Sequence, residues 1–336
     1  MNLTISLPKI FKMKKIIGIG NALVDVLAFT HDEKILDHFS LPKGSMQLVD
    51  GAMSAKILKE TEHLQRSMAS GGSAANTIHG LAMLGADTGF IGAVGKDENG
   101  AFFENELKSA GVRTFLKKQN TPTGTAAAFV TPDSERTFAT YLGAALELDP
   151  ADLHPDLFSG YDLLYLEGYL IYSPGFVAEA CSIARSLNMK VALDLASYNV
   201  VEENLRSFKE IVEKYTDILF ANSAEAKAYT GEEPEEALRI LSEHCEIAVV
   251  KTGPLGSLVK SRKESLKIPA FPVECNDTTG AGDLYASGFL YGLALGKPLK
   301  KCGLYGSYLA AKVIEIPGAR IGTEKWPEIR KTVSVL

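Results

Sequence analysis

The stretch NDTTGAGDLYASGFLYGLALG, residues 276–296, places glycines and threonines directly before a long apolar segment. Gly280 and Gly282 carry no side chain, so backbone N–H groups there can approach an anion closely. The segment from about 281 to 295 predicts a helix, and the positive end of its dipole would point at the same anion. The stretch therefore predicts an anion hole suited to the charge that develops on a transferring phosphoryl group.

Asp283 stands where a phosphate-binding loop would carry a lysine. The pattern GxxxxGK[ST] fails because there is no lysine, and the dinucleotide pattern GxGxxG fails because Asp283 falls inside it. An acid in the first turn of a helix can simply complement the helix dipole. Beside a phosphate, however, a carboxylate repels the ligand unless it faces another group, such as the hydroxyl of a second substrate. Asp283 is thus a candidate base that orients an alcohol and takes its proton late in a loose transition state.

Composition and charge limit the class of function. The chain has 336 residues, of which 46% are hydrophobic, so it can bury a large core. Its net charge of −6 argues against a nucleic-acid partner, because such proteins usually show a basic face. No apolar run approaches the ~20 residues that span a bilayer, and the N-terminus lacks the unbroken apolar stretch of a signal peptide. We expect a cytoplasmic protein without a membrane partner, with residues 1–12 as a tail before one domain over 13–336.

The cysteines are widely spaced and form no CxxC pair. We expect all four, Cys181, Cys245, Cys275 and Cys302, to be buried and reduced.

Strands and helices alternate along most of the chain. The segments YDLLYLEGY (161–169), KVALDLAS (190–197) and DILFANS (217–223) are nearly continuous apolar runs with helical stretches between them. Such runs are typical of a parallel, doubly wound α/β sheet with helices on both faces. A last long helix is expected over 299–314.

Two segments interrupt the alternation, at about 30–50 and 113–141. They predict a small β-sheet laid over one edge of the main sheet as a lid, the second with a hairpin that turns at Pro132-Asp133. The stretch KKIIGIGNALVDVLAF (14–29) reads as one first strand.

Two motifs resemble the signatures of the PfkB/ribokinase-like family of carbohydrate and nucleoside kinases. DTTGAGD (277–283) matches the C-terminal signature, and GGSAANTIHGLAMLGADTGFIGAVGKDENG (71–100) resembles the N-terminal one. The resemblance covers residues 14–325. It implies a ribokinase-like fold with a lid, and ATP-dependent phosphorylation of a primary hydroxyl with ATP and Mg²⁺ as cofactors. The residues that it places in the reaction are Asp283 as the base and Gly280, Ala281 and Gly282 as the anion hole.

The resemblance also implies a substrate side. Asp25 would accept hydrogen bonds from ring hydroxyls, helped by Asn21, and a buried strand-end acid is costly unless it serves a ligand or a salt bridge. Gly71 and Gly72 would lie under the substrate as the hinge of the lid, although a tight start to a helix explains the glycines equally well. Asn76 would contact a hydroxyl.

On the nucleotide side, NSAE (222–225) matches the family's NxxE motif, whose acid, Glu225, organises Mg²⁺ usually through water. Asn222 and Glu225 would also form the N-cap and capping box of a helix. KTGPLGS (251–257) resembles the family's KxGxxG turn, with a plain hairpin turn as an equal alternative. The implied ATP-binding residues are Asn222, Lys251, Thr252, Gly253, Gly256 and Thr278; Asp277 and Thr279 would contribute to the K⁺ site of many members.

The substrate is suggested by a closer likeness to the bacterial adenosine-kinase-like branch. The segments that carry it are KGSMQLVD (43–50), ERTFATYLGAALEL (135–148), YLEGYL (165–170) and DTTGAGDLYASGFLYG (277–292). The likeness implies a nucleoside acceptor, with a sugar kinase of ribokinase or fructokinase type as the alternative.

An apolar lid would suit a nucleobase, with Phe138 and Tyr141 as stacking candidates that would equally form the inner face of the lid hairpin. Arg136 would meet the substrate or the polyphosphate, or pair with Glu135. Exposed strands of the lid would allow a homodimer.

A different class of function fits less well. A dinucleotide-dependent oxidoreductase needs a third glycine and a later acid than GIGNALVD (18–25) provides. A non-catalytic nucleotide-binding protein would have had no reason to keep Asp283.

Overall fold

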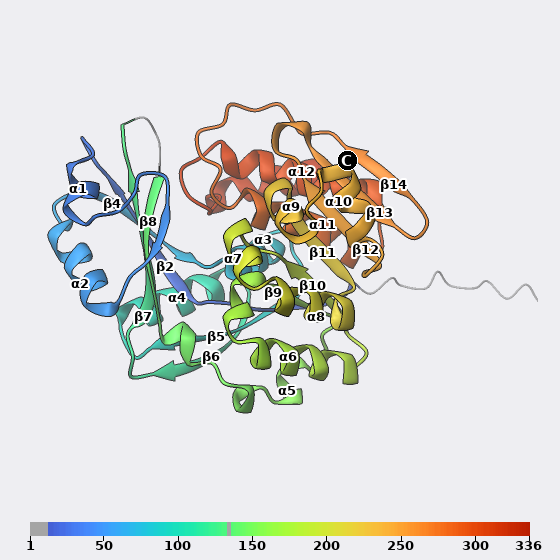
Figure 1. Ribbon diagram of the computed structural model, residues 1–336, viewed down its shortest axis with the longest axis horizontal. Helices are drawn as coiled ribbons and strands as arrows, with labels where there is room; N and C mark the ends of the chain where they lie inside the picture. The colour runs from blue at the N-terminus through green and yellow to red at the C-terminus, as the bar shows by residue number, and fades with distance from the viewer. Residues whose placement is uncertain (1–12, 133–135) are drawn as a thin grey trace, which may run out of the picture.

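The computed structural model describes residues 13–132 and 136–336, and within them the chain forms a nine-stranded and a five-stranded sheet (Figure 1). The larger sheet has the order β14-β13-β12-β11-β10-β9-β1-β5-β6. Its strands from β12 to β6 are parallel, and β13 and β14 continue it in antiparallel pairing. The predicted doubly wound, mainly parallel α/β fold with a small second sheet is confirmed.

The strands of the larger sheet are β1 (Ile16–Ile19), β5 (Thr88–Gly95), β6 (Arg113–Gln119), β9 (Leu163–Glu167), β10 (Lys190–Asp194), β11 (Ile218–Asn222), β12 (Ile247–Lys251), β13 (Ser257–Ser261) and β14 (Ser265–Ile268). The smaller sheet has the order β3-β8-β7-β2-β4, with β2 (Leu23–Phe29), β3 (Met46–Leu48), β4 (Gln65–Gly71), β7 (Thr123–Val130) and β8 (Arg136–Gly143). The helices are α1 (Lys34–His38), α2 (Gly51–Glu60), α3 (Ser73–Met83), α4 (Glu98–Ser109), α5 (Pro155–Phe158), α6 (Pro174–Ser186), α7 (Tyr198–Glu203), α8 (Leu205–Tyr215), α9 (Ser223–Thr230), α10 (Pro234–Leu241), α11 (Ala281–Ala294), α12 (Leu299–Ile314) and α13 (Trp326–Val335).

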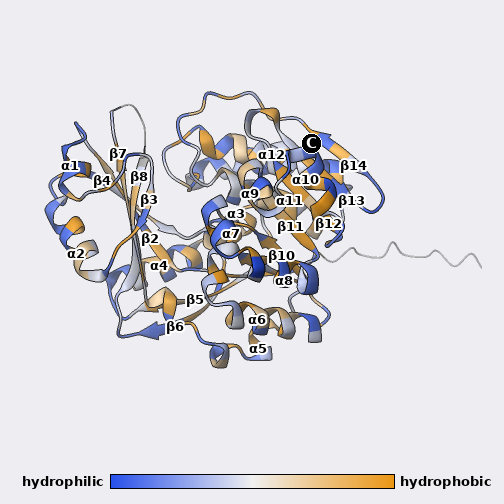
Figure 2. Cartoon of the chain, viewed as in Figure 1, coloured by the Kyte–Doolittle hydropathy of each residue, from blue (hydrophilic) through white to orange (hydrophobic). Residues whose placement is uncertain are grey.

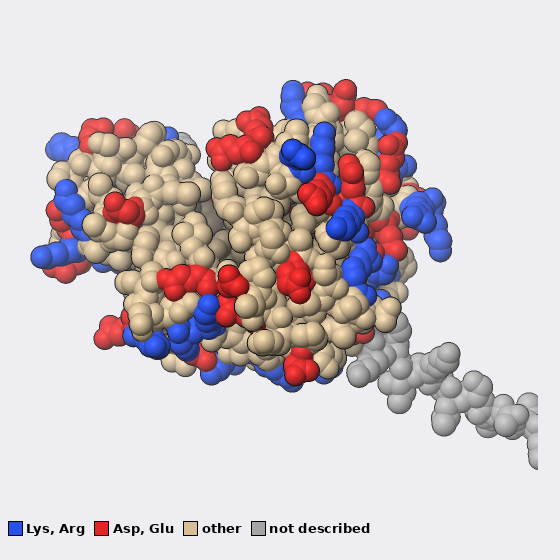
Figure 3. Space-filling model, turned by 60° about the horizontal axis from the view of Figure 1, so that its bottom comes forward, with Lys and Arg blue, Asp and Glu red and all other residues tan. Residues whose placement is uncertain are grey.

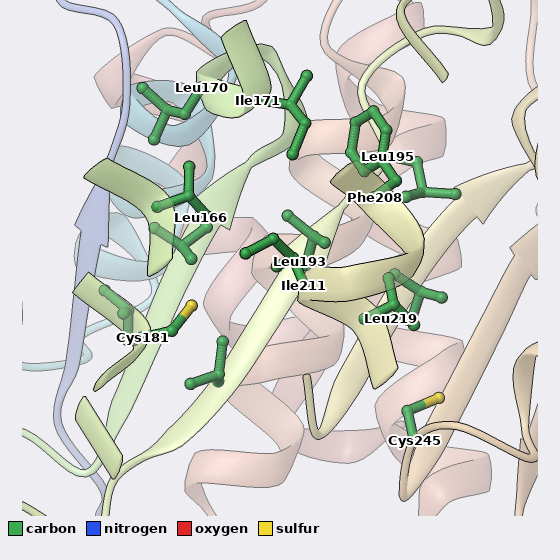
Figure 4. Close-up of a cluster of buried hydrophobic side chains, with 14 of the residues drawn as sticks. Leu166, Leu170, Ile171, Cys181, Leu193, Leu195, Phe208, Ile211, Leu219 and Cys245 are labelled. Carbon is green, nitrogen blue, oxygen red and sulfur yellow. The ribbon is translucent and has the colours of Figure 1, made fainter. Parts of the chain in front are cut away.

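Helices cover the larger sheet on both faces, and this explains why its central strands are almost entirely apolar (Figure 2). On one face, Leu166, Leu193 and Leu219 of three neighbouring strands pack with Phe208 and Ile211 of α8 (Figure 4). The other face of the larger sheet packs against α3, α4 and α11, with α4 on β5 and β6. The two core layers hold the strand ends at one edge of the sheet in fixed positions.

The predicted last helix over 299–314 is α12, with the same bounds. The predicted first strand, in contrast, is two strands. β1 belongs to the larger sheet and β2 to the smaller one. The break falls at Gly20 and Asn21, where a side chain on Gly20 would meet Glu167 and the N–H of Asn21 donates to the Glu167 carboxylate. These contacts turn the chain out of the larger sheet.

The smaller sheet has other limits than the predicted lid segments. β6, in the segment 113–141, pairs with β5 and belongs to the larger sheet. As an edge strand it is covered less completely, so it lacks a continuous apolar run. β2 and β4 add two strands that lie outside the predicted segments. β7 and β8 do pair antiparallel, while the predicted turn at Asp133 and the tail 1–12 lie outside the described residues.

Three of the four cysteines, Cys181, Cys245 and Cys302, are buried and free as expected, whereas Cys275 is exposed. In the described part of the chain no helix is both long and apolar enough to cross a membrane.

Candidate active site

Four neighbouring parallel strands end in polar residues at the same edge of the larger sheet. They are Glu167 on β9, Asp194 on β10, Asn222 on β11 and Lys251 on β12. The carboxyl edge of an open α/β sheet is where ligands bind in such folds. The functional site is therefore expected at the carboxyl ends of these strands.

Asp283 lies in the first turn of α11 and faces the first turn of α3. Ser73 Oγ donates to its Oδ1 over 2.7 Å, and Asn76 Nδ2 donates to its Oδ2 over 2.9 Å. Burial raises the pKa of Asp283 to about 6, although these two hydrogen bonds act in the opposite direction. The carboxylate is thus held in one orientation and can accept a proton near neutral pH.

The two helices are joined directly beneath this carboxylate. Ser287 Oγ donates to the carbonyl oxygens of Thr77, at 2.8 Å, and of Asp283, at 2.9 Å. Gly80 allows this approach, because a Cβ there would meet the side chain of Ser287. The relative position of α3 and α11 is therefore fixed by packing and hydrogen bonds.

The glycine-rich turn before α11 leaves donors free. Gly280 has a φ of 76° and packs against Ala319, so a side chain there would be strained and would clash. Among the described residues, the N–H groups of Gly280 and Gly282 have no acceptor, whereas the N–H of Ala281 donates to the Thr278 carbonyl oxygen over 3.2 Å. Two of the three predicted anion-hole residues thus present free N–H groups at a helix N-terminus, where anions bind.

The predicted substrate residues meet where the chain passes from the smaller to the larger sheet. Gly72 has a φ of 94°, and a Cβ on it would run into the carbonyl oxygen of Asn21. Gly71, at the end of β4, lies beside the carboxylate of Asp25. Asn76 keeps one buried acceptor, Oδ1, without a partner among the described residues.

Glu167 was missed by the sequence reasoning. Its Oε1 accepts from the N–H and the Nδ2 of Asn21, at 2.9 and 2.7 Å, and its Oε2 accepts from the N–H of Ala74 at 2.7 Å. Burial raises its pKa to about 7. Glu167 thus fixes the side chain of Asn21 and the start of α3. It ends an apolar strand, the same signal that pointed to Asp25.

Asn222 and Glu225 form the predicted capping box of α9. Asn222 Oδ1 accepts from the N–H of Glu225 at 2.9 Å, and the Glu225 carboxylate accepts from the N–H and Nδ2 of Asn222 at 2.7 and 2.6 Å. Burial raises the pKa of Glu225 to about 7. Each carboxylate oxygen retains a lone pair for water, so the residue fits a magnesium site reached through water. Within residues 13–132 and 136–336, no three His, Cys, Asp or Glu side chains are grouped so that they could hold a metal ion.

Lys251 extends its ammonium toward the glycine turn. Nζ forms an ion pair with Asp194 Oδ2 at 2.8 Å, and the two side chains are 14% and 6% exposed. Nζ lies 3.1 Å from the position that a Cβ on Gly282 would take. Asp194, like Glu167, ends an apolar strand and was missed.

The KxGxxG segment is a tight connection between β12 and β13. Gly253 and Gly256 both have positive φ, and the N–H of Thr252 donates to the Gly256 carbonyl oxygen over 2.8 Å. The hairpin alternative is therefore present. Its role along the nucleotide stays a prediction.

Two loop residues tie the site to its surroundings. Asp277 Oδ1 accepts from the N–H and Oγ1 of Thr279 at 3.0 and 2.8 Å, and its Oδ2 accepts from the N–H of Gly318. Arg320, which was missed, donates to the carbonyl oxygen and Oγ of Ser70 on β4 at 2.8 and 2.6 Å. Asp277 thus joins the turn before α11 to the loop after α12, and Arg320 joins that loop to the smaller sheet. The monovalent-cation role of Asp277 and Thr279 stays a prediction.

One face of the smaller sheet is directed toward the loop after α12. Leu27, Ala128 and Phe138 occupy paired positions on that face, and Leu27 lies beside Gly318. Asp25, paired with Ala126, is on the same face. A notch separates the smaller sheet, with α1 and α2, from the larger sheet and its helices (Figure 3).

The opposite face is covered by α2. Tyr141 is paired with Thr125 there, and its ring packs at Gly51. Ser54 Oγ of α2 lies 2.9 Å from Thr125 Oγ1. Of the two aromatic candidates, only Phe138 is therefore on the face with Asp25. Tyr141 does not share the face of Asp25, because residues three apart on a strand point to opposite sides. The side chain of Arg136 lies outside the described part of the chain.

Comparisons with known proteins agree with this geometry. Residues 52–326 match the model of the pfkB family of carbohydrate kinases. The chain is 30% identical to an adenosine kinase of Saccharomyces cerevisiae over 337 residues, covering 92% of this chain and 97% of the relative. It is 30% identical to a 5-dehydro-2-deoxygluconokinase of Bacillus subtilis, covering 84% and 91%. The solved structure of an adenosine kinase from Sinorhizobium meliloti superposes with a TM-score of 0.86 at 34% identity, covering 95% of this chain and 99% of that one. The chain belongs to the pfkB family of carbohydrate kinases, and it is an ATP-dependent kinase that acts on a hydroxyl group.

Proposed function

We propose that the protein is a nucleoside kinase of the adenosine-kinase type, which transfers the γ-phosphoryl group of ATP to the 5′-hydroxyl of a ribonucleoside. The observation that carries the proposal is the half-buried aromatic ring of Phe138, which lies on the same face of the smaller sheet as Asp25, beside the buried Leu27 and Ala128. A nucleobase is a flat, largely apolar ring system that gains from burial against such a face. In this proposal Asp25 accepts hydrogen bonds from the ribose hydroxyls.

In the proposed reaction Asp283 is the base. The 5′-oxygen attacks the γ-phosphorus, the bond from this phosphorus to the bridging oxygen breaks, and the proton passes to the Asp283 carboxylate. The free N–H groups of Gly280 and Gly282 face the charge on the transferring group. Asn76 donates to Asp283, and its unpartnered Oδ1 is available to a substrate hydroxyl.

The nucleotide would lie along Thr252, Gly253, Gly256 and Thr278, beside the N-terminus of α11. Mg²⁺, when bound with ATP, neutralises phosphate charge. Glu225 would hold its waters, oriented by the two hydrogen bonds from Asn222.

A sugar kinase of ribokinase or fructokinase type is the second candidate. The relationship to 5-dehydro-2-deoxygluconokinases supports a carbohydrate acceptor. Asp25 beside Gly71 would serve the hydroxyls of a free sugar as well as those of a ribose. The half-buried ring of Phe138, on the same face as Asp25, favours the nucleoside, because a free sugar has no flat ring system to stack on it.

The acceptor is tested by a screen of adenosine, inosine, ribose, fructose and 5-dehydro-2-deoxygluconate with ATP and Mg²⁺. We expect the highest kcat/KM with a nucleoside. Phe138→Ala should raise the KM for that nucleoside roughly tenfold, because an aromatic contact contributes about 1.4 kcal/mol, and should leave the KM for ATP unchanged. Tyr141→Ala, on the other face, is the matched control and should alter stability only. A clear preference for a free sugar, with no effect of Phe138→Ala on the acceptor KM, would contradict the nucleoside assignment.

The base is tested by Asp283→Asn. Turnover should fall by roughly 10²-fold or more, while ATP binding stays largely intact, because the amide orients the hydroxyl but takes no proton. Asp156→Asn, in the first turn of α5, is the control for a mere helix-dipole effect and should leave turnover unchanged. Near-wild-type turnover of Asp283→Asn refutes the assignment.

A further inference from the structure

The fold brings a lysine to a loop whose sequence has none. DTTGAGD lacks the lysine of other phosphate-binding loops, but Lys251, the last residue of β12, places Nζ 3.1 Å from the Cβ position of Gly282. The side chain is 14% exposed, so it is largely enclosed by protein. The positive charge lies at the same turn as the free N–H groups of Gly280 and Gly282.

The charges around Lys251 make this position significant. Its Nζ is bonded to Asp194 at 2.8 Å, and Glu225 and Asp283 are close enough to interact with it electrostatically. Three carboxylates therefore surround one ammonium where a triphosphate must bind. Among the described residues the only hydrogen bond of Nζ is the one to Asp194. An ammonium has three protons, so two remain for an anionic ligand.

We propose that Lys251 is a catalytic residue, whose ammonium contacts the oxygens of the transferring phosphoryl group while Asp194 acts as a positioning residue that holds it there. As the acceptor oxygen bonds to the γ-phosphorus, the bond to the bridging oxygen breaks, ADP leaves, and the proton goes to Asp283. Lys251 stays protonated throughout and offsets the charge on the phosphoryl oxygens. The proposal rests on phosphoryl transfer by this kinase, and it does not depend on which acceptor is used.

A role in positioning charge has a second effect that a purely structural lysine would lack. The ammonium of Lys251 favours the ionised form of Asp283, against the effect of burial. Removing the positive charge should therefore raise the pKa of Asp283. The acidic limb of the pH–rate profile would then move to higher pH.

The test compares Lys251→Met, Lys251→Arg and Asp194→Asn, with the acceptor that the wild type turns over fastest. We expect Lys251→Met to lower kcat roughly 10²-fold or more with a change of only a few-fold in the KM for ATP, and to shift the acidic limb upward. Lys251→Arg should recover part of kcat. The kcat of Asp194→Asn should lie between those of Lys251→Met and Lys251→Arg. Lys190→Met is the matched control, because Lys190 forms an ion pair with the buried Asp217 at the opposite end of β10. It should leave kcat and the pH profile unchanged.

Three results would overturn the proposal. The first is a raised KM for ATP at constant kcat, which would make Lys251 an anchor of the nucleotide only. The second is an unchanged kcat in folded Lys251→Met. The third applies if Lys251→Met fails to fold. It is a kcat of Asp194→Asn within twofold of the wild-type value, together with an acidic limb that does not move. Failure of the wild type with every nucleoside concerns the acceptor alone, and the same variants are then compared with the best sugar or, in its absence, by ATP transfer to water.

Discussion

At the scale of the residue, opposing effects set the acidity of Asp283. Burial raises its pKa, whereas the hydrogen bonds from Asn76 and Ser73 and the charge of Lys251 lower it. The net result, a pKa of about 6, leaves the carboxylate ionised at neutral pH and still basic enough to accept a proton.

The pH dependence of catalysis follows from this balance. Because Asp283, the proposed base, must be ionised to accept a proton, kcat/KM should fall below about pH 6. Ser73→Ala removes a hydrogen bond that favours the ionised form, so it should move this limb to higher pH. Steady-state rates between pH 5 and 9, with enzyme returned to pH 7.5 as a check for inactivation, measure both. If the acidic limb of the wild-type profile lies near pH 4, or if Ser73→Ala does not move that limb, Asp283 is not the titrating base.

The residues that were predicted differ in kind from those that were missed. Asp283 and the glycines stand inside one short segment, so spacing along the chain is enough to identify them. Glu167 and Asp194 act on partners 146 and 57 residues away, on Asn21 and Lys251. Such pairs exist only after the strands have been ordered in the sheet. Ending an apolar strand was the one local signal they gave.

At the scale of the element, the start of α3 depends on a single glycine. Gly72 is its N-cap, with a φ of 94°, and the carbonyl oxygen of Asn21 fills the place of a side chain. Glu167 holds both sides of this junction through Asn21 and Ala74. A displacement at Gly72 would therefore reach Asn21 and Ala74, next to the proposed substrate residues.

Gly72→Ala tests this dependence against a matched glycine. Gly85→Ala introduces the same kind of strain, since Gly85 has a φ of 99°, but a Cβ there has nothing within 4 Å. The control should lose about 1–2 kcal/mol of unfolding free energy and keep its kcat. Gly72→Ala should lose more, because of the added clash, and should also lose activity. Urea unfolding measures the free energy of unfolding, and steady-state kinetics measure kcat. If Gly72→Ala and Gly85→Ala lose the same free energy and keep the same kcat, the junction at Gly72 is not tight.

The elements themselves were predictable where packing follows one periodic pattern. The helix over 299–314 lies on an amphipathic stretch after a proline, and its bounds agree with the sequence. The first strand was misread because residues 16–29 are mostly apolar and contain no proline, although the chain changes sheets at Asn21. β6 was assigned to the lid because an edge strand, covered on fewer sides, alternates like a strand of a small sheet. Local pattern does not say which sheet a strand joins.

At the scale of the whole molecule, the site lowers the stability of the fold that carries it. Burial raises the pKa values of Asp283, Glu167 and Glu225, so the folded chain binds protons at these groups more tightly than the unfolded chain. Their contribution to stability is complete below the ordinary carboxyl pKa of about 4, and it is lost as the pH rises through 6 to 7. His79 acts in the opposite direction, because burial lowers its pKa.

Asp283→Asn isolates one member of this set. The amide cannot ionise, so the variant without ligands should unfold at a higher temperature than the wild type at pH 8, with a smaller difference at pH 5. The other titrating groups are common to both proteins and cancel in the comparison. Thermal unfolding by circular dichroism at the two pH values measures the difference. If the difference in unfolding temperature between variant and wild type is equal at pH 5 and pH 8, or larger at pH 5, burial of the Asp283 charge does not destabilise the fold.

The break at Gly20 and Asn21 is one of four places at which the described chain changes sheets. The others lie at Gly72, at residues 120–122, and between Gly143 and Ala144. Two of these connections, residues 20–22 and 120–122, are three residues long, whereas the other two run through α3 to β5 and through residues 144–162 to β9. The strands of the smaller sheet are therefore interleaved along the sequence with those of the larger one. No single stretch of the chain contains the smaller sheet without also containing β5 and β6. Adding or removing a residue at residues 20–22 or 120–122 would shift the smaller sheet relative to the larger one, so the lengths of these two connections are constrained by the geometry of the site.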